Sequence, residues 1–286
     1  MTQLIAGFDD VAEDYDVALV DLWGCYHDGE RPYPEALEAL RRYRKRGGRV
    51  VLLPNAPRPS AGVAEFLAKI GAPEDTHDAI MSSGEACQRA IATGRHGRRL
   101  HYVGPERDRA MLADLDLVSH PLEEASAVLL TGLRDDSRER PEDYDDEAGR
   151  WRALGLSVVC ANPDVVVDRG ATRLWCAGAV AERYAAAGGQ VVWYGKPHPP
   201  SYEAAFARLR ELGLTRLDRD RVVAIGGGLK TDVAGANRQG LDASIVTGGI
   251  AAAEVGDDPE RPDRDRLRAY CARHGQLPRY AVARLR

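Results

Sequence analysis

The sequence predicts an α/β protein built on a parallel sheet, with a second α/β domain inserted into the first. Short runs of β-branched residues alternate with amphipathic stretches along almost all of the 286 residues, which is typical of repeated strand–helix units. A chain of this length suits about two domains. Its composition, 44% hydrophobic and 29% charged, is that of an ordinary globular protein and excludes a mainly disordered chain.

The expected strands are short apolar runs, and each one ends in, or is followed at once by, Gly, Pro, Ser or Asn. In the first, VALV, four consecutive apolar residues indicate a central buried strand. The strand candidates, in order, are 17–23, 49–54, 79–82, 100–104, 127–132, 157–161, 190–195, 221–226 and 243–248. The amphipathic stretches between them, which predict helices, are 34–46, 60–70, 84–93, 141–154, 177–187, 200–212 and 232–238.

The middle of the chain has its own series of strands and helices and is the acidic, loop-rich part. We therefore assign residues 72–187 to the inserted domain and residues 1–71 and 188–286 to the first domain. The charge run at 135–147 is interpreted as a solvated loop and helix start.

Charge and cysteine usage exclude several classes of function. The net charge is −5, from 39 basic and 44 acidic residues, and no dense basic patch is present to bind nucleic acid. The first residues carry acids where a secretion signal needs positive charge, and no apolar run approaches a membrane span. Five cysteines without a CxxC pair indicate reduced packing residues. We expect a cytoplasmic protein that acts on a small molecule, with no nucleic-acid or membrane partner.

Polar residues that follow the apolar runs are the candidates for chemistry, because ligands of an open parallel sheet lie beyond the carboxyl ends of its strands. Asp21 follows the first run, and Asn55 follows the second. Lys196 follows VVWY and is one of only four lysines, which suggests a position that needs an ammonium group. Asp232 ends a glycine-rich turn that opens a helix, where backbone amides and the carboxylate could hold a phosphate or a cation. A dinucleotide fingerprint is rejected there, because the G-x-G-x-x-G spacing fails at Thr231.

Taken in order, strand-Asp, strand-Asn, strand-Lys-Pro and strand-Gly-x5-Asp resemble the four motifs of the haloacid dehalogenase (HAD) superfamily. The domain-sized insertion between the second and third motifs is similar to the α/β cap of its class IIA members. The resemblance covers nearly the whole chain and implies a Rossmann-like HAD core with an inserted α/β cap domain. The supporting segments are LLPNAPRPS at 52–60, ANPD at 161–164, GKP at 195–197 and TDVAGANRQG at 231–240.

The resemblance also implies roles for individual residues. Asp21 is the expected nucleophile, which forms an aspartyl phosphate, and Lys196 supplies positive charge against the repulsion of two anions. Asp21 and Asp232 are the expected ligands of Mg²⁺, with a backbone carbonyl at residue 23. Class IIA proteins often pair through their caps, so a homodimer is expected. The substrate-binding candidates are Asn55, Asn162, Asp164 and Arg173, the last because an arginine can clamp an anion.

Three positions depart from the family pattern. Residue 23 is Trp where the family has an acid that protonates the leaving oxygen and later activates water. Residue 54 is Pro where a hydroxyl usually holds the phosphate, and residue 227 is Gly where a second metal-binding acid is usual. Mg²⁺ held by the two remaining carboxylates is therefore weakened or absent. General acid–base catalysis is worth roughly 10²–10⁴-fold, so a fast generic phosphatase is not expected.

Three functions stay open. The first is a phosphatase-like enzyme of low or narrow activity on a small phosphorylated metabolite, in which His27 or Asp28 takes over proton transfer. The second keeps Asp21 as nucleophile but directs it at a carbon electrophile without metal, since the dehalogenases of the superfamily resemble this chain in an aromatic residue at position 23. The third is a non-catalytic protein that binds a ligand or partner.

Overall fold

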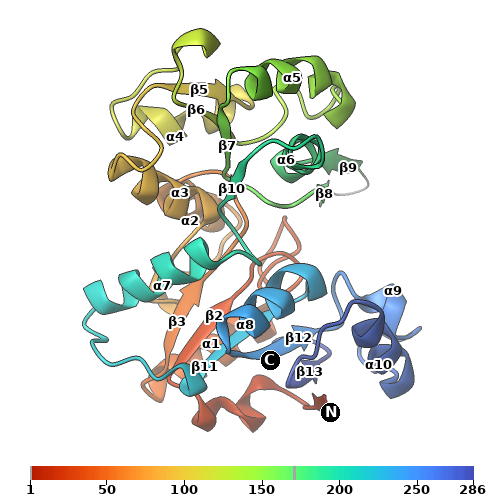
Figure 1. The fold of residues 1–286 in the computed structure, drawn as a ribbon. Coiled ribbons are helices and arrows are strands. Elements are labelled where there is room, and N and C mark those ends of the chain that lie inside the picture. The colour runs from red at the N-terminus through yellow and green to blue at the C-terminus, as the bar shows by residue number, and fades with distance from the viewer. Residues whose placement is uncertain (1, 170–171) are drawn as a thin grey trace. The chain divides into compact units, whose positions relative to one another are not determined.

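The computed structural model describes residues 2–169 and 172–286, and the chain divides into two compact units. We call Met1–Pro54, Ala64–Met81 and Ala205–Arg286 the core unit, and Asn55–Val63 with Ser82–Ala204 the cap unit. Figure 1 labels the helices and strands of both. The helices α2 (Ser60–Lys69) and α7 (Pro199–Glu211) each begin in the cap unit and end in the core unit.

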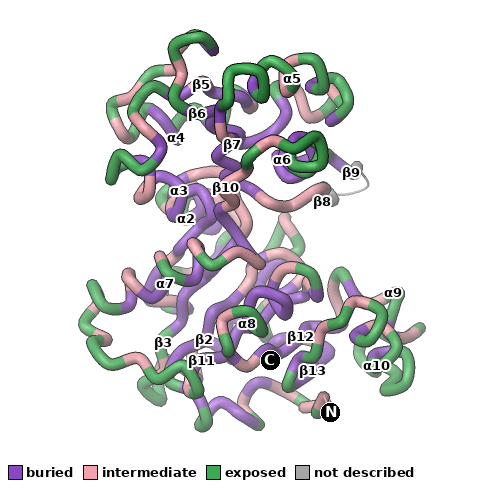
Figure 2. Tube along the Cα trace, in the orientation of Figure 1, coloured by how far each residue is buried: buried purple, intermediate pink, exposed green. Residues whose placement is uncertain are grey.

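The core unit contains a seven-stranded sheet in which every pairing is parallel. Its strands are β1 (Gln3–Leu4), β2 (Val17–Val20), β3 (Arg49–Leu52), β4 (Ala79–Ile80), β11 (Val222–Gly226), β12 (Asp242–Val246) and β13 (Tyr280–Val282). Their order across the sheet is β1-β13-β12-β11-β2-β3-β4. All residues of β2 and β11 are buried, as expected for central strands of a parallel sheet covered on both faces (Figure 2).

Further helices of the core unit are α1 (Pro34–Lys45), α8 (Ala234–Gln239), α9 (Ala252–Val255) and α10 (Arg264–Arg273). α1 starts with proline, whose fixed φ suits the first helical turn, and buries Leu37 and Leu40 on one face. α8 follows a single π-helical turn, Leu229–Val233, and ends at Gly240, whose φ of 68° suits a left-handed C-cap.

The cap unit has a parallel sheet of its own. Its strands are β5 (Leu100–Val103), β6 (Ala127–Leu130), β7 (Ser157–Cys160) and β10 (Val191–Trp193), in the order β10-β7-β6-β5. An antiparallel hairpin of β8 (Val166–Arg169) and β9 (Thr172–Trp175) stands outside this sheet. The helices of the unit are α3 (Ser83–Ala92), α4 (Ala110–Ala113), α5 (Asp145–Ala153) and α6 (Ala177–Ala186).

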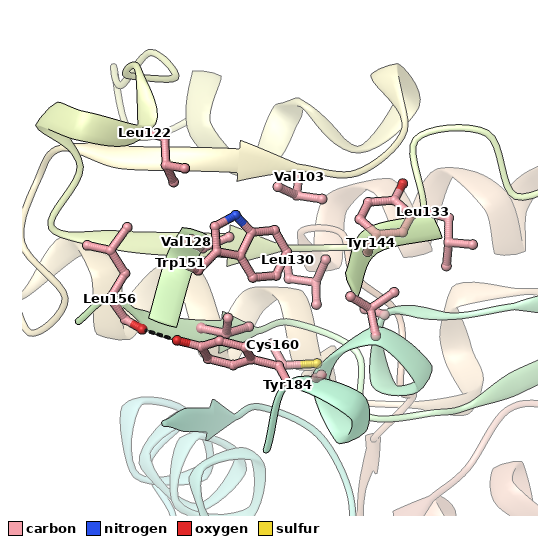
Figure 3. Close-up of a cluster of buried hydrophobic side chains, with 14 residues drawn as sticks. Val103, Leu122, Val128, Leu130, Leu133, Tyr144, Trp151, Leu156, Cys160 and Tyr184 are labelled. Carbon is pink, nitrogen blue, oxygen red and sulfur yellow. Dashed lines mark hydrogen bonds between the residues drawn. The ribbon is translucent and has the colours of Figure 1, made fainter. Parts of the chain in front are cut away.

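A cluster of buried side chains forms the hydrophobic core of the cap unit (Figure 3). Trp151 from α5 and Tyr184 from α6 are fully buried, with ring centroids 5.8 Å apart. The Tyr184 hydroxyl donates a hydrogen bond of 2.6 Å to the carbonyl of Leu156, which satisfies its polar end inside an apolar environment. The cap unit therefore has the separate core that defines a domain.

All nine expected strands and all seven expected helical stretches are present, and their ends lie within three residues of the expected ones. The stretch 141–154 begins with a 3₁₀ turn, and the stretch 232–238 begins within a π turn. Three features were not expected from the sequence: the strands β1 and β13, which pair with each other at one side of the core sheet, and the β8–β9 hairpin. Three segments lie in a different unit from the one expected. Residues 55–63 lie in the cap unit. Residues 72–81 lie in the core unit, where β4 pairs with β3, and residues 188–204 lie in the cap unit, where β10 pairs with β7.

No helix within the described ranges combines the length and the apolar character needed to cross a membrane.

Candidate active site

Asp21 stands at the carboxyl end of β2, in the middle of the core sheet. Its backbone amide donates a hydrogen bond of 2.8 Å to the carbonyl of Ile225 on the neighbouring strand β11, one residue beyond the Val20–Ile225 pair. The residue is half-buried. This is the position at which open parallel sheets bind their ligands.

Asp232 follows the next strand of the sheet, β11, by way of the glycine-rich turn. It is 3% exposed, and its Oδ2 accepts a hydrogen bond of 3.0 Å from the amide of Gly228. A Cβ atom on Gly226 would lie 2.2 Å from Cγ of Asp232, so only glycine fits under this carboxylate. Asp21 and Asp232 thus follow neighbouring strands at the same edge of the sheet.

These two carboxylates are the candidate ligands for a divalent cation. The described part of the chain contains no group of three or more His, Cys, Asp or Glu side chains able to hold a metal. Mg²⁺ is commonly bound by one or two carboxylates together with waters and substrate phosphate, so the donor set fits a weakly held Mg²⁺. At Gly227, a Cβ atom would have its nearest neighbour at 3.7 Å, and packing therefore leaves room for the acid that the family usually has there.

Trp23 is held by the loop that follows Asp21. Gly24 adopts φ = 68°, and the amides of Tyr26 and His27 donate to the carbonyl of Leu22 at 2.8 and 3.1 Å. The indole packs so closely on Gly29 that a Cβ atom there would lie 2.3 Å from the ring. The loop therefore fixes the indole of Trp23 against Gly29, and the indole has no group that exchanges protons at neutral pH.

His27 is fully buried in this loop. Its Nδ1 accepts a hydrogen bond of 2.9 Å from the amide of Gly29, which leaves the ring proton on Nε2, and this atom has no hydrogen-bond partner among the described residues. Its ring lies edge-on to those of Trp23 and Phe66. Burial lowers the pKa of His27 to about 4. A buried neutral imidazole does not suit the proton transfer expected from the sequence.

Asp28 is exposed and stabilises its own turn. Its Oδ1 accepts hydrogen bonds from the amides of Glu30 and Arg31 at 2.8 and 2.7 Å. The bond from Arg31, followed by that from Glu30, lowers the pKa of the carboxyl group. Because a carboxylate stabilised in this way is a poor proton donor at neutral pH, its environment does not suit the catalytic role either.

In the cap unit, Asn55 holds the backbone of Lys196. Its Oδ1 accepts from the amide of Lys196 at 2.8 Å, and its Nδ2 donates to the carbonyl of Lys196 at 3.0 Å and to Oδ1 of Asp164 at 2.8 Å. Both ends of the Asn55 amide are therefore engaged with protein groups. Asn55 therefore holds the backbone of Lys196 in place, and the substrate contact expected of Asn55 from the sequence stays a prediction.

Lys196 follows β10 and is only 3% exposed, with a cis peptide bond to Pro197. Gly195 has φ = 122°, and a Cβ atom on it would lie 2.3 Å from Pro163, so this turn requires glycine. Asn162 is also buried, and its Oδ1 accepts from the amide of Asp164 at 3.1 Å. The fold thus brings the second motif, the ANPD segment and the third motif together within the cap unit.

Arg173 lies on β9 of the hairpin and is exposed, next to the buried Leu174. The expectation that Asp21 and Lys196 share one crevice stays a prediction, since they belong to different units.

Arg58 and Asp108 of the cap unit form a further polar pair that was not expected from the sequence. Asp108 is 2% exposed, and its Oδ1 lies 3.7 Å from Nη2 of Arg58. The signal that could have found Asp108 is its place after the expected strand 100–104, the same kind of place that singled out Asp21 and Asn55.

Comparison with known proteins agrees with this arrangement. Residues 18–118 match the family described as haloacid dehalogenase-like hydrolase, and residues 193–266 match a second family described as HAD-hydrolase-like. A crystal structure of a hydrolase of the haloacid dehalogenase-like family from Brucella suis 1330 is 37% identical, covers 99% of this chain and 100% of its own, and has a TM-score of 0.84. The chain belongs to the haloacid dehalogenase-like hydrolases.

Phosphatase activity is named among the more distant matches. D-glycerol 3-phosphate phosphatase of Mycobacterium tuberculosis is 27% identical over 247 residues, which are 85% of this chain, and the chain spans 66% of that protein's length. A crystal structure of glycerol phosphate phosphatase from Mycobacterium tuberculosis in complex with calcium is 26% identical, with a TM-score of 0.64, and covers 88% of this chain and 73% of its own.

Proposed function

We propose that this protein is a phosphohydrolase that cleaves a phosphate monoester of a small metabolite, with Asp21 as the nucleophile and with slow turnover. The observation that carries the proposal is the half-exposed Asp21 at the carboxyl end of the central strand β2, with Asp232 on the turn after the adjacent strand. Membership of a hydrolase family that includes phosphatases supports it.

Asp21 attacks phosphorus, the P–O bond to the leaving group breaks, and the phosphoryl group is transferred to the carboxylate. Asp21 and Asp232 would hold Mg²⁺, which supplies positive charge that offsets the repulsion between two anions. The ammonium group of Lys196 adds to this charge at the phosphoryl oxygens. Asn55 contributes indirectly, because its hydrogen bonds to both backbone groups of Lys196 orient the residue.

The leaving oxygen departs without a proton from the protein. Trp23 has no acid to offer, His27 is buried and neutral, and Asp28 is engaged in its turn. Since a positioned general acid is worth roughly 10²–10⁴-fold, esters with stabilised leaving groups, such as p-nitrophenyl phosphate, react much faster than alkyl esters. The same missing group would activate water in the second step, so the aspartyl phosphate accumulates.

The test is hydrolysis of p-nitrophenyl phosphate by the full chain, with Mg²⁺ and with EDTA. We expect a burst of p-nitrophenol followed by slow steady turnover, both dependent on Mg²⁺, and a phosphoryl adduct on Asp21 in the mass spectrum of the quenched protein. Asp21→Asn abolishes the burst and the adduct. Asp14→Asn, the same chemical change at an exposed position, serves as the control and keeps both.

Other outcomes would contradict the proposal in identifiable ways. Metal-free turnover of a halogenated acid that requires Asp21 would establish chemistry at carbon instead. Stabilisation by phosphorylated metabolites without a burst or adduct would establish a binding protein.

The homodimer and the cytoplasmic location suggested by the sequence stay predictions.

A further inference from the structure

A charged groove lies in the core unit, between the second half of α1, the start of β3 and the segment that precedes β4. We call it the α1 groove. Its cavity volume is about 730 Å³, within the range typical of small-molecule sites. Apart from two glycines, every residue that lines it is charged. The cations are Arg41, Arg44, Lys45 and Arg49, and the acids are Glu38, Asp75 and Asp78.

The α1 groove lies at the amino ends of the core strands. Arg49 is the first residue of β3, and Asp78 directly precedes β4. Asp21 stands at the carboxyl end of β2, which runs parallel to β3. The groove and the candidate active site therefore lie at opposite edges of the core sheet, and a molecule in the groove does not meet the nucleophile.

At one end of the α1 groove, three cations share one carboxylate. The side chain of Asp78 is only 7% exposed. It accepts hydrogen bonds from Arg44 Nη2 at 3.0 Å, Arg49 Nη1 at 2.9 Å and the amide of Val50 at 2.8 Å. Burial alone would raise the pKa of this carboxyl group, but these hydrogen bonds outweigh burial and lower it. Lys45 is exposed, and its ammonium group pairs with no described residue.

This end of the groove thus has a formal charge of two positive units, from Arg44, Lys45 and Arg49 against Asp78. The end of α1 accounts for only part of this excess. A helix C-terminus carries about half a negative charge, which favours a cation in the last turn but does not balance two. An anionic group from outside the protein is needed to neutralise the rest.

At the other end of the groove, two carboxylates share one cation. Arg41 donates from Nε to Asp75 at 2.9 Å and from Nη1 to Glu38 at 2.7 Å. The side chains of Asp75 and Glu38 are 63% and 59% exposed. The formal charge of this end is one negative unit. Glu38 and Lys45 stand about two turns of α1 apart, or about 10 Å along the helix axis, so the groove has two ends of opposite charge.

We propose that the α1 groove binds a dipolar small molecule, a phosphorylated amine, with its phosphate at the Lys45 end and its ammonium group at the Glu38 end. A phosphate group carries about −1.5 to −2 charge at neutral pH, which matches the two positive units there. It accepts several hydrogen bonds, and Lys45 and Arg49 both offer donors. Because the groove is remote from Asp21, this ligand is an effector and not the substrate.

Charge disfavours the simpler ligands. A molecule with an anion at both ends would place one of them against Glu38 and Asp75, which have only Arg41 to offset them. A polyamine would place an ammonium group among Arg44, Lys45 and Arg49. Like charges in contact weaken binding, whereas a dipolar ligand meets the opposite charge at each end.

The test is titration of the full ¹⁵N-labelled chain with 6-aminohexyl phosphate and with hexyl phosphate, followed by NMR. The amides of Gly47 and Gly48 line the groove and report binding there. The amides of residues 226–228 report separately on phosphate binding at the candidate active site. We expect both compounds to shift the groove signals, and 6-aminohexyl phosphate to bind there about fivefold more tightly, the size of effect of one exposed ion pair.

Two exposed residues on α1 provide the variants. Lys45→Gln should weaken the binding of both compounds at the groove by about fivefold or more. Glu38→Gln should remove the preference for 6-aminohexyl phosphate and leave the affinity for hexyl phosphate unchanged or higher. Lys69→Gln and Glu65→Gln make the same changes at exposed positions of α2, away from the groove, and should retain both the affinities and the preference.

Three results would overturn the proposal: groove signals that do not respond to either compound, a response that survives Lys45→Gln, or equal affinity for the two compounds in the unaltered chain. The last result would indicate a simple anion site. None of these results bears on the proposed phosphohydrolase function, because the burst and the adduct on Asp21 are measured at the other edge of the sheet.

Discussion

Gly227→Asp tests whether the candidate metal site lacks only one ligand. The position directly follows β11, and a Cβ atom there meets Val246 at 3.7 Å and Ile250 at 4.0 Å, which are ordinary van der Waals distances. The φ of Gly227 lies outside the left-handed range, so a side chain adds no left-handed strain. The new carboxylate would join Asp21 and Asp232 at the same edge of the sheet.

The expected effect has two parts. Without metal, a third carboxylate beside two others repels them, so the variant should unfold at a lower temperature than the wild type in EDTA. With Mg²⁺ the repulsion becomes attraction, and the affinity for Mg²⁺ should rise by at least about tenfold, equivalent to about 1.4 kcal/mol. The stability of the variant should therefore depend much more steeply on Mg²⁺ concentration.

The assay is thermal unfolding across a Mg²⁺ titration, together with the p-nitrophenyl phosphate burst at each concentration. Gly227→Asn has nearly the same size without the charge, and Gly227→Ala tests the space alone. If Gly227→Asp gains no more Mg²⁺ affinity than Gly227→Asn, then Asp21 and Asp232 do not form a metal site, and the reasoning is refuted.

Three further predictions concern single side chains. Asp108→Asn should raise the free energy of unfolding at pH 7 by about 1 kcal/mol, because the neutral amide removes a buried charge whose Oδ1 accepts no hydrogen bond from the described residues. Because the folded pKa of Asp108 is raised, this gain should shrink as the pH falls through that pKa, and a gain equally large at pH 3 would contradict the prediction. His27→Gln should leave the dependence of the reaction rate on pH unchanged between pH 5 and 8, because the pKa of His27 is about 4. If the substitution removes a pH-dependent step of the rate in that range, His27 does take part in proton transfer. Asn55→Ala removes three hydrogen bonds around Lys196. It should lower the burst rate by about tenfold or more, with little change in the KM for p-nitrophenyl phosphate. An unchanged burst rate would show that Asn55 does not position Lys196 for catalysis.

The order of strands and helices was readable from the sequence because it depends on local periodicity. The buried run VALV, the proline that begins α1 and the glycine that ends α8 each act within a few residues of themselves. The unit boundaries were misplaced because strand pairing is not local. β4 and β10 were recognised as strands, but their partners lie tens of residues away.

Motif spacing identified Asp21, Lys196 and Asp232 as chemical candidates, since each follows a strand at the edge where ligands bind. Motif spacing could not show that Asn55 is hydrogen-bonded to the backbone of Lys196, because Lys196 lies 141 residues further along the chain. A histidine and an aspartate close to the nucleophile looked equally suited to proton transfer. Only their surroundings in the folded chain show that His27 is buried and neutral and that Asp28 is engaged in a turn.

The sequence by itself determined the family, the parallel sheets and the strand-end positions of the candidate residues, because these follow from residue type and order. The tertiary structure alone decided which polar groups are buried, which are satisfied by protein partners and which, like Oδ1 of Asp108, have no hydrogen-bond partner among the described residues. Desolvation and hydrogen bonding depend on atoms that meet through space, and residues distant in the chain supply most of those atoms.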